Sequence, residues 1–227
     1  MIDIKLLALA LLGGVLGLDV VSFPQAMISR PVVAATLAGA MFGSGSSGLV
    51  AGVALELFAL ETLPFGASRY PEWGSAAAAG SALYVTQPAA NAGSLVAAVL
   101  GALLVAWVGG QSMYLLRRLN GALAMRRLEA LNRGSTDALT GLQLTGLTAD
   151  LIRGALLTLL GFVLLRPGVA WLTRHWHLDD RLSYVAVFCV ACAVAGSAAW
   201  RLFHGTAGAR WFFLGGLALG LTAVALT

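Results

Sequence analysis

The stretch that decides the fold lies at residues 19–80 and reads DVVSFPQAMISRPVVAATLAGAMFGSGSSGLVAGVALELFALETLPFGASRYPEWGSAAAAG. It belongs to the most apolar half of the chain, yet it holds every charged residue between Lys5 and Arg117. These charged residues are Asp19, Arg30, Glu56, Glu61, Arg69 and Glu72. A carboxylate inside a hydrocarbon layer costs several kcal/mol unless it is paired or faces a wet cavity. We therefore expect Glu56, which stands in the apolar run VALELFAL, to face a polar pathway or a partner rather than lipid.

Prolines and glycines break the helices around these carboxylates. The prolines are Pro24, Pro31, Pro64 and Pro71, and a second break, TQPAANAG, follows at residues 86–93. Broken helices at membrane depth are tolerated only where the freed backbone is buried in protein or lines a cavity. A buried acid beside a broken helix is typical of transporter binding sites. Residues 19–92 are therefore predicted to form the core of a substrate path.

The polar residues of this core are candidates for two kinds of role. Candidates for binding substrate are Asp19, Gln25, Glu56, Gln87 and Asn91, and candidates for structural or gating roles are Arg30, Pro31, Pro64 and Gly66. Residues 19–30 are predicted to be amphipathic: Asp19, Ser22, Gln25 and Ser29 follow one another at spacings of three or four residues, which would place them on one helical face. That face either lines a solute path or contacts another helix. Pro31 suits the first turn of a helix. Arg30 would reach the membrane surface or pair with a carboxylate such as Glu56.

The composition of the whole chain fixes its class. Hydrophobic residues make up 59% and charged residues 11% of the 227 residues, and the mean hydropathy is +0.87. Soluble domains carry about 25% charged residues. The chain is therefore predicted to be an all-α polytopic integral membrane protein, a single domain over residues 1–227. At about 20 residues for each spanning helix, it has room for roughly six to eight segments, some broken or re-entrant. The apolar N-terminus is expected to be a retained first helix rather than a cleaved signal peptide.

Arginines mark the side of the membrane on which each connection lies. The segment RRLNGALAMRRLEALNR, residues 117–133, carries five arginines and one glutamate. Basic residues favour cytoplasmic connections, so residues 117–138 are predicted to be cytoplasmic and residues 166–181 to lie on the opposite side. The basic segment suits a helix at the membrane surface, with docking to a soluble partner as the alternative. The net charge of +4 is explained by these connections, and no nucleic-acid partner is expected.

Several short patterns resemble metal, redox or nucleotide sites but lack the context that such sites need. HWH at residues 175–177 is more typical of a wet membrane boundary than of a zinc site. Cys189 and Cys192 lie in an apolar run, where cysteine behaves as a small buried hydrophobe. GSGSSG at residues 43–48 follows no strand, so a dinucleotide site is not expected. We predict no metal, no cofactor and no catalytic residue. Asp150 and Arg153, three residues apart, are interpreted as a structural charged pair.

Residues 13–80 also resemble a known family. The segments ISRPVVAATLAGAMFG, GLVAGVALELFAL and LPFGASRYPE are similar to the membrane-spanning IIC subunit of the mannose/sorbose-type sugar phosphotransferase system (PTS). The shared features are an Arg-Pro pair at 30–31, a glycine-rich turn at 43–48, a Leu-Glu pair at 55–56, Pro-x-Gly-Ala at 64–67, and Pro-Glu at 71–72. Asp19 and Gln25 also fit. The family usually has an aspartate where this chain has Ser44.

This resemblance implies a bacterial inner-membrane sugar permease. In the family, IIC works with a second membrane subunit, IID, while soluble IIA and IIB subunits carry the phosphoryl group that is transferred to the entering sugar. Trimers of IIC–IID pairs and an elevator-like movement of the broken-helix core are implied as well. Phosphoryl transfer would belong to the partners, since the chain's histidines, His175, His177 and His204, all lie late in the sequence and in expected loops.

Two other functions stay open at this point. The serine at position 44 leaves room for a transport-inactive structural or regulatory protein derived from the permease family. An intramembrane enzyme is a weaker alternative, because the sequence shows neither a Ser–His pairing in facing helices nor a cluster of metal ligands.

Overall fold

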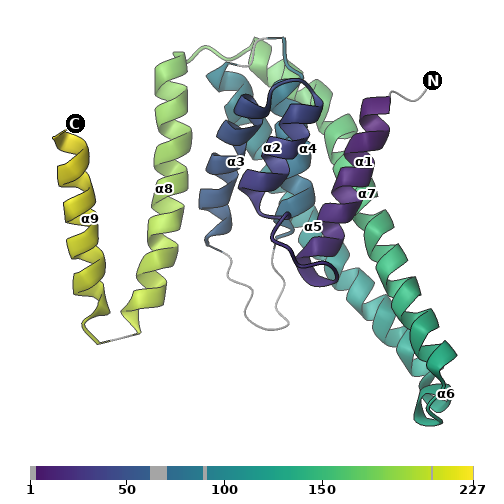
Figure 1. The fold of residues 1–227 in the computed structure, drawn as a ribbon. Helices are drawn as coiled ribbons and strands as arrows, with labels where there is room; N and C mark the ends of the chain where they lie inside the picture. The colour runs from purple at the N-terminus through teal and green to yellow at the C-terminus, as the bar shows by residue number, and fades with distance from the viewer. Residues whose placement is uncertain (1–3, 62–70, 89–90, 206, 227) are drawn as a thin grey trace.

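The computed structural model describes residues 4–61, 71–88, 91–205 and 207–226, and it is all-helical over these residues (Figure 1). The helices are α1 (Ile4–Val21), α2 (Pro31–Met41), α3 (Gly45–Ala59), α4 (Trp73–Val85), α5 (Ala92–Arg126), α6 (Leu128–Asn132), α7 (Thr136–Arg174), α8 (Asp180–His204) and α9 (Ala209–Ala225). Four of them, α1, α5, α7 and α8, are long and apolar enough to cross a membrane. The predicted class, a polytopic membrane protein with some short segments, is confirmed.

The predicted broken helices are α2, α3 and α4. They have 11, 15 and 13 residues, which at 1.5 Å per residue is about 16–23 Å, less than the roughly 30 Å of a bilayer's hydrocarbon core. Small residues bring them together: a Cβ on Gly39 would lie 2.6 Å from the Cα atom of Gly48. The Ser81 hydroxyl of α4 donates to the Ala35 carbonyl of α2 at 2.6 Å. Close backbone approach through small residues is the usual packing mode between helices in membranes.

Helix α4 is the centre of the molecule, and the long helices surround it. Its residues from Gly74 to Tyr84 are all buried, and it contacts α1, α2, α3, α5 and α7. Glycines also let α1 lie directly on α7, since a Cβ on Gly13 would be 2.1 Å from the Thr158 hydroxyl oxygen. Helix α9, by contrast, contacts α8 and no other described helix. Helix α4 is thus enclosed by its neighbours, whereas α2 and α3 each keep an exposed apolar face, for example at Leu37 and Leu49.

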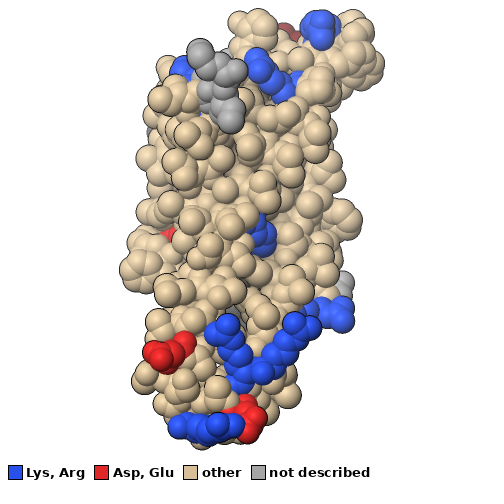
Figure 2. All heavy atoms as spheres, turned by 90° about the vertical axis from the view of Figure 1, so that its right-hand side faces the viewer, with Lys and Arg blue, Asp and Glu red and all other residues tan. Residues whose placement is uncertain are grey.

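Residues 113–150, which we call the arm, reach beyond the other helices at the lower end of the view (Figure 1). Helices α5 and α7 have 35 and 39 residues, about 52 and 58 Å, which exceeds the hydrocarbon thickness. Several arginine side chains lie at the far end of the arm, below a broad band with few charges, and further basic side chains lie at the upper end (Figure 2). We call the far end of the arm the arginine-rich end. The connection between α7 and α8, within residues 166–181, lies at the opposite end of the molecule, an arrangement compatible with the prediction that the two segments lie on opposite sides of the membrane.

Two predicted boundaries differ from the structure. Residues 117–126 continue α5 instead of forming a separate connection, because this segment contains no proline and is rich in helix-favouring Leu, Ala, Met and Arg. Residues 19–30 are not one amphipathic helix: α1 ends at Val21, and residues 22–30 form a loop. Pro24 lacks an amide hydrogen and disfavours a helical conformation at Phe23, which explains the early end of α1.

Candidate functional site

Asp19 anchors the loop at residues 22–30. It lies near the end of α1 with 3% of its surface exposed, and its carboxylate accepts hydrogen bonds from the amides of Ala26 at 2.6 Å and Ser29 at 2.9 Å. These bonds hold a loop in which Gln25 and Met27 have positive φ angles of 57° and 61°, a backbone conformation unfavourable for residues other than glycine. The exposed Gln25 amide donates to the Val21 carbonyl at 3.0 Å. Asp19 and Gln25 are therefore close in space, and the Asp19 carboxylate accepts its hydrogen bonds from backbone amides of the loop.

Glu56 completes the start of α2 from the neighbouring helix α3. Helix α2 begins at Pro31, as predicted, but the side chain of Arg30 makes no capping hydrogen bond. The Glu56 carboxylate accepts instead from the Val32 amide at 3.2 Å and forms an ion pair with Arg30. A carboxylate at a helix N-terminus satisfies a free amide and favours the helix dipole. The expectation that Glu56 meets a polar partner rather than lipid is met within this chain.

Gln87 and Asn91 lie at the opposite end of α4 from Glu56. The Gln87 amide donates to the Leu83 carbonyl at 2.9 Å. The Asn91 side chain accepts from the Ser94 amide at 2.9 Å and so caps the start of α5. The five candidate binding residues therefore form two groups at opposite ends of the broken-helix core. Pro64 and Gly66 lie outside the described residues.

Glu72, which was not among the candidate site residues, is one of the most buried charged residues in the described structure. It is 2% exposed and caps α4, where its Oε1 atom accepts from the Ser75 amide at 3.3 Å and the Ser75 hydroxyl at 2.6 Å. Its Oε2 atom lies 3.0 Å from the Nη1 atom of Arg153. The local signal for the cap, an acid three residues before Ser75 and just after Pro71, is visible in the sequence. The contact with Arg153 has no local signal.

Arg153 joins Glu72 to a second carboxylate. Its Nε and Nη2 atoms lie 3.0 and 2.8 Å from Oδ1 of Asp150, and Nη1 also donates to the Ser112 hydroxyl at 3.2 Å. The Oδ2 atom of Asp150 accepts from the Ser22 hydroxyl at 2.9 Å. One guanidinium thus links α4, α5 and α7, and Ser22 adds the loop after α1. The predicted pairing of Asp150 with Arg153 is present, and it is part of this larger network.

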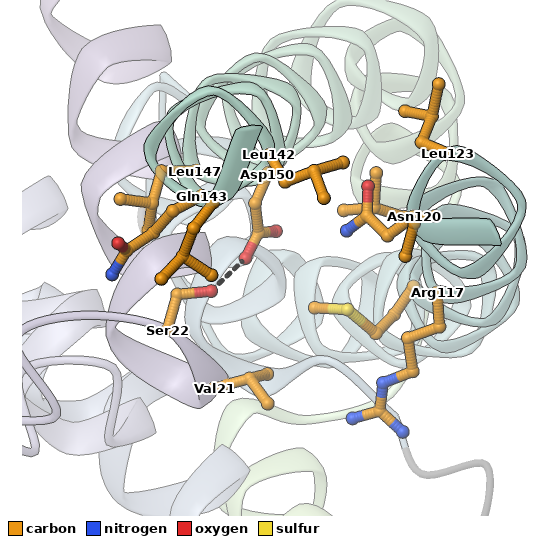
Figure 3. Close-up of a pocket in the computed structure, with 14 residues that line it drawn as sticks. Val21, Ser22, Arg117, Asn120, Leu123, Leu142, Gln143, Leu147 and Asp150 are labelled. Carbon is orange, nitrogen blue, oxygen red and sulfur yellow. Dashed lines mark hydrogen bonds between the residues drawn. The ribbon is translucent and has the colours of Figure 1, made fainter. Parts of the chain in front are cut away.

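A cavity of about 620 Å³ opens beside Asp150, between the loop after α1 and the two long helices of the arm. It is lined by Val21, Ser22, Met113, Leu116, Arg117, Asn120, Leu123, Ala124, Leu139, Leu142, Gln143, Gly146, Leu147 and Asp150. The side-chain amide of Asn120 points toward the carboxylate of Asp150 across the cavity, whereas the guanidinium of Arg117 and the amide of Gln143 point away (Figure 3). The cavity therefore has leucine walls and three converging polar groups, including Ser22.

The described residues offer no arrangement suited to metal chemistry. Among them, no group of three or more His, Cys, Asp or Glu side chains is placed to hold a metal ion. What the cavity and the network provide instead is one carboxylate acceptor, one amide and one hydroxyl, which suits hydrogen bonding to hydroxyl groups.

Comparisons with known proteins agree with this architecture. Residues 3–179 match the family model described as "PTS system sorbose-specific iic component". A solved structure described as "Structure of membrane protein" has the same fold, with a TM-score of 0.74 and 17% sequence identity, covering 100% of this chain and 94% of that chain. No curated protein matches the chain significantly.

Proposed function

The chain belongs to the family of sorbose-type IIC components of the sugar phosphotransferase system, and from this premise we propose that it translocates a hexose-type sugar across the bacterial inner membrane. The observation that carries the proposal is the family match over residues 3–179, which includes all of the broken-helix core. Short helices that carry carboxylates inside a membrane bundle are the usual setting of transporter binding sites.

We propose that substrate binding uses the two groups of polar residues at the ends of the core. Asp19, Gln25 and Glu56 would act toward the arginine-rich end, and Gln87 and Asn91 toward the other end. Glu56 is the first choice, because its partner Arg30 has a side chain 53% exposed, so the ion pair can be rearranged by a ligand at low cost. Arg30 and Pro31 would fix the start of α2, and Pro64 and Gly66 would serve as gating positions.

The partners follow from the same family. Family members work with other components of the phosphotransferase system and with a sugar. We propose a IID membrane subunit, soluble IIA and IIB phosphocarriers, and an assembly of three IIC–IID pairs, with the arginine-rich end in the cytoplasm. Phosphoryl transfer would then belong to the soluble subunits, and the core would move as an elevator against the long helices.

The serine at position 44 is compatible with the permease function. Its hydroxyl accepts from the Ser47 amide at 3.3 Å and caps α3, just after Gly43 with its positive φ of 102°. Serine and aspartate are about equally good N-cap residues. The replacement of the family's usual aspartate therefore preserves the start of α3, which favours a working permease over an inactive relative.

Sugar uptake with and without the partners tests this proposal. We expect little uptake by the reconstituted single chain, and phosphorylation-dependent uptake when it is expressed with IID, IIA and IIB subunits of the same family. L-sorbose, D-mannose and D-fructose are the sugars to try first. Robust uptake by the single chain would contradict the dependence on partners, and no uptake by the complete system would favour the transport-inactive alternative.

A further inference from the structure

The carboxylate of Asp150 is held from one side and faces the cavity from the other. Arg153 fixes its Oδ1 atom through two nitrogens, at 3.0 and 2.8 Å. Its Oδ2 atom receives the Ser22 hydroxyl at 2.9 Å, and Ser22 and Asp150 both line the cavity (Figure 3). A carboxylate oxygen can accept more than one hydrogen bond. Asp150 is therefore an oriented acceptor that already binds one hydroxyl group at the cavity wall.

We propose that this cavity is a binding site for a neutral polyhydroxylated ligand, in which Asp150 accepts a ligand hydroxyl in the place now taken by Ser22. Asn120, opposite, would donate to or accept from a second hydroxyl. The leucine walls, for example Leu116 and Leu142, would pack against the C–H groups of the ligand. The choice of a sugar as the ligand rests on the proposed function, and the site would be a station that the sugar occupies toward the arginine-rich end.

The charges around the cavity favour a neutral ligand. Behind Asp150, two carboxylates share one guanidinium, so the network repels anions. The guanidinium of Arg117 points away from the centre of the cavity, and the facing amide of Asn120 carries no charge. A volume of about 620 Å³ falls in the usual range of small-molecule sites, which are mostly apolar with a few placed polar groups. A hydroxyl-rich molecule matches this combination.

Ser22 is suited to exchange with a ligand. Ser22 is exposed at the surface, and its hydroxyl donates a hydrogen bond to Asp150. The loop that carries it has an independent anchor, because the Asp19 carboxylate holds the amides of Ala26 and Ser29. The bond from Ser22 to Asp150 can therefore open without releasing the loop. Replacing Ser22 with alanine should remove the competing hydroxyl and leave the acceptor available.

Direct sugar binding to the full chain in lipid nanodiscs tests the site. The probes are L-sorbose, D-mannose and D-fructose, with affinity measured by titration calorimetry or ligand-observed NMR. We expect Asn120→Ala to weaken binding about tenfold, as for loss of one well-placed hydrogen bond, and Ser22→Ala to strengthen it severalfold. Asn132→Ala, the same substitution on the exposed α6 of the arm, is the matched control and should leave affinity unchanged.

The outcomes separate this inference from the transport function. Unchanged affinity in both Asn120→Ala and Ser22→Ala would place sugar binding elsewhere and overturn the inference, while uptake with the partners would still support the permease. Weaker binding in Ser22→Ala would also overturn it, since Ser22 would then be part of the site. A phospholipid that copurifies with the chain, is lost on Leu142→Trp and is not displaced by any sugar would identify the cavity as a lipid site. If the unmodified chain binds none of the sugars, the proposed site beside Asp150 is refuted. The permease function is tested separately, by sugar uptake with the partner subunits.

Discussion

At the scale of single residues, Glu56 combines a structural contact with a proposed role in binding. Its carboxylate pairs with Arg30 and caps α2 through the Val32 amide. The sequence predicted that Glu56 would meet a polar partner, with Arg30 as one candidate, because a lone carboxylate in an apolar run is costly. It did not predict the cap, which depends on how α3 packs against the first turn of α2.

Glu56→Gln separates these two roles. Glutamine keeps an acceptor for the Val32 amide and removes the charge that pairs with Arg30. A half-exposed ion pair contributes about 0–1 kcal/mol, so we expect a small change in melting temperature. If the carboxylate binds sugar hydroxyls, affinity should fall about tenfold. Binding and melting temperature are measured on the same purified complex, and a lower melting temperature with unchanged affinity would show that Glu56 is structural.

The charges of Arg153, Glu72 and Asp150 compensate one another inside the protein. The Arg153 side chain is 9% exposed, and those of Glu72 and Asp150 are 2% and 4% exposed. Arg153→Met leaves both carboxylates without their cation, and loss of one partner from a buried pair costs about 3–5 kcal/mol. We therefore expect a large loss of thermal stability. Adding Glu72→Gln and Asp150→Asn to this variant should recover most of it.

The matched control is Arg133→Met. Arg133 pairs with Glu129 on the exposed tip of the arm, where the side chains are 71% and 83% exposed, and such pairs contribute about 0–1 kcal/mol. Thermal unfolding in a mild detergent compares the variants. A triple variant that is no more stable than Arg153→Met would show that the contacts of the guanidinium, rather than its charge, hold the network together.

At the scale of elements, the sequence predicted those features that depend on local chemistry. Pro31 marks the start of α2 as expected from its missing amide hydrogen, and the TQPAANAG break separates α4 from α5. The Asp150–Arg153 pair follows from helical spacing. Helix α7 runs through Pro167 to Arg174, inside the segment 166–181 that the sequence assigned to a connection. In the cavity, Ser22 and Asp150 are 128 residues apart, a contact that depends on tertiary packing and that no local pattern in a single sequence indicates.

The arm shows a second limit of local reasoning. An arginine-rich segment indicates a side of the membrane, but it does not tell whether the helix stops at the membrane surface. Helices α5 and α7 are longer than the hydrocarbon core of a bilayer is thick, and they form a hairpin closed by α6, with Glu129 and Arg133 paired at the tip. The protruding hairpin, together with the loop after α1, creates the cavity beside Asp150. The candidate site in the arm thus follows from the length of two helices rather than from a motif.

At the scale of the whole molecule, the distribution of charge predicts an orientation in the membrane. The tip of the arm and the connection between α7 and α8 lie at opposite ends (Figure 1), and residues 117–133 of the arm carry five arginines and one glutamate. Basic residues near the ends of membrane helices favour the cytoplasmic side. We therefore expect Asn132 in the cytoplasm and His177 outside it. Both residues are exposed, so a cysteine at either position can react with a reagent in water.

Labelling of single cysteines measures this orientation. Asn132→Cys and His177→Cys are made separately in a background in which Cys189 and Cys192 are replaced by alanine, and intact cells are treated with a thiol reagent that does not cross membranes. Cysteine at position 177 should be labelled in intact cells, and cysteine at position 132 only after the membrane is permeabilised. The opposite pattern would place the arm outside. It would also move the cavity beside Asp150 away from the side on which soluble phosphocarriers act, and so contradict its proposed place as a station toward the cytoplasm.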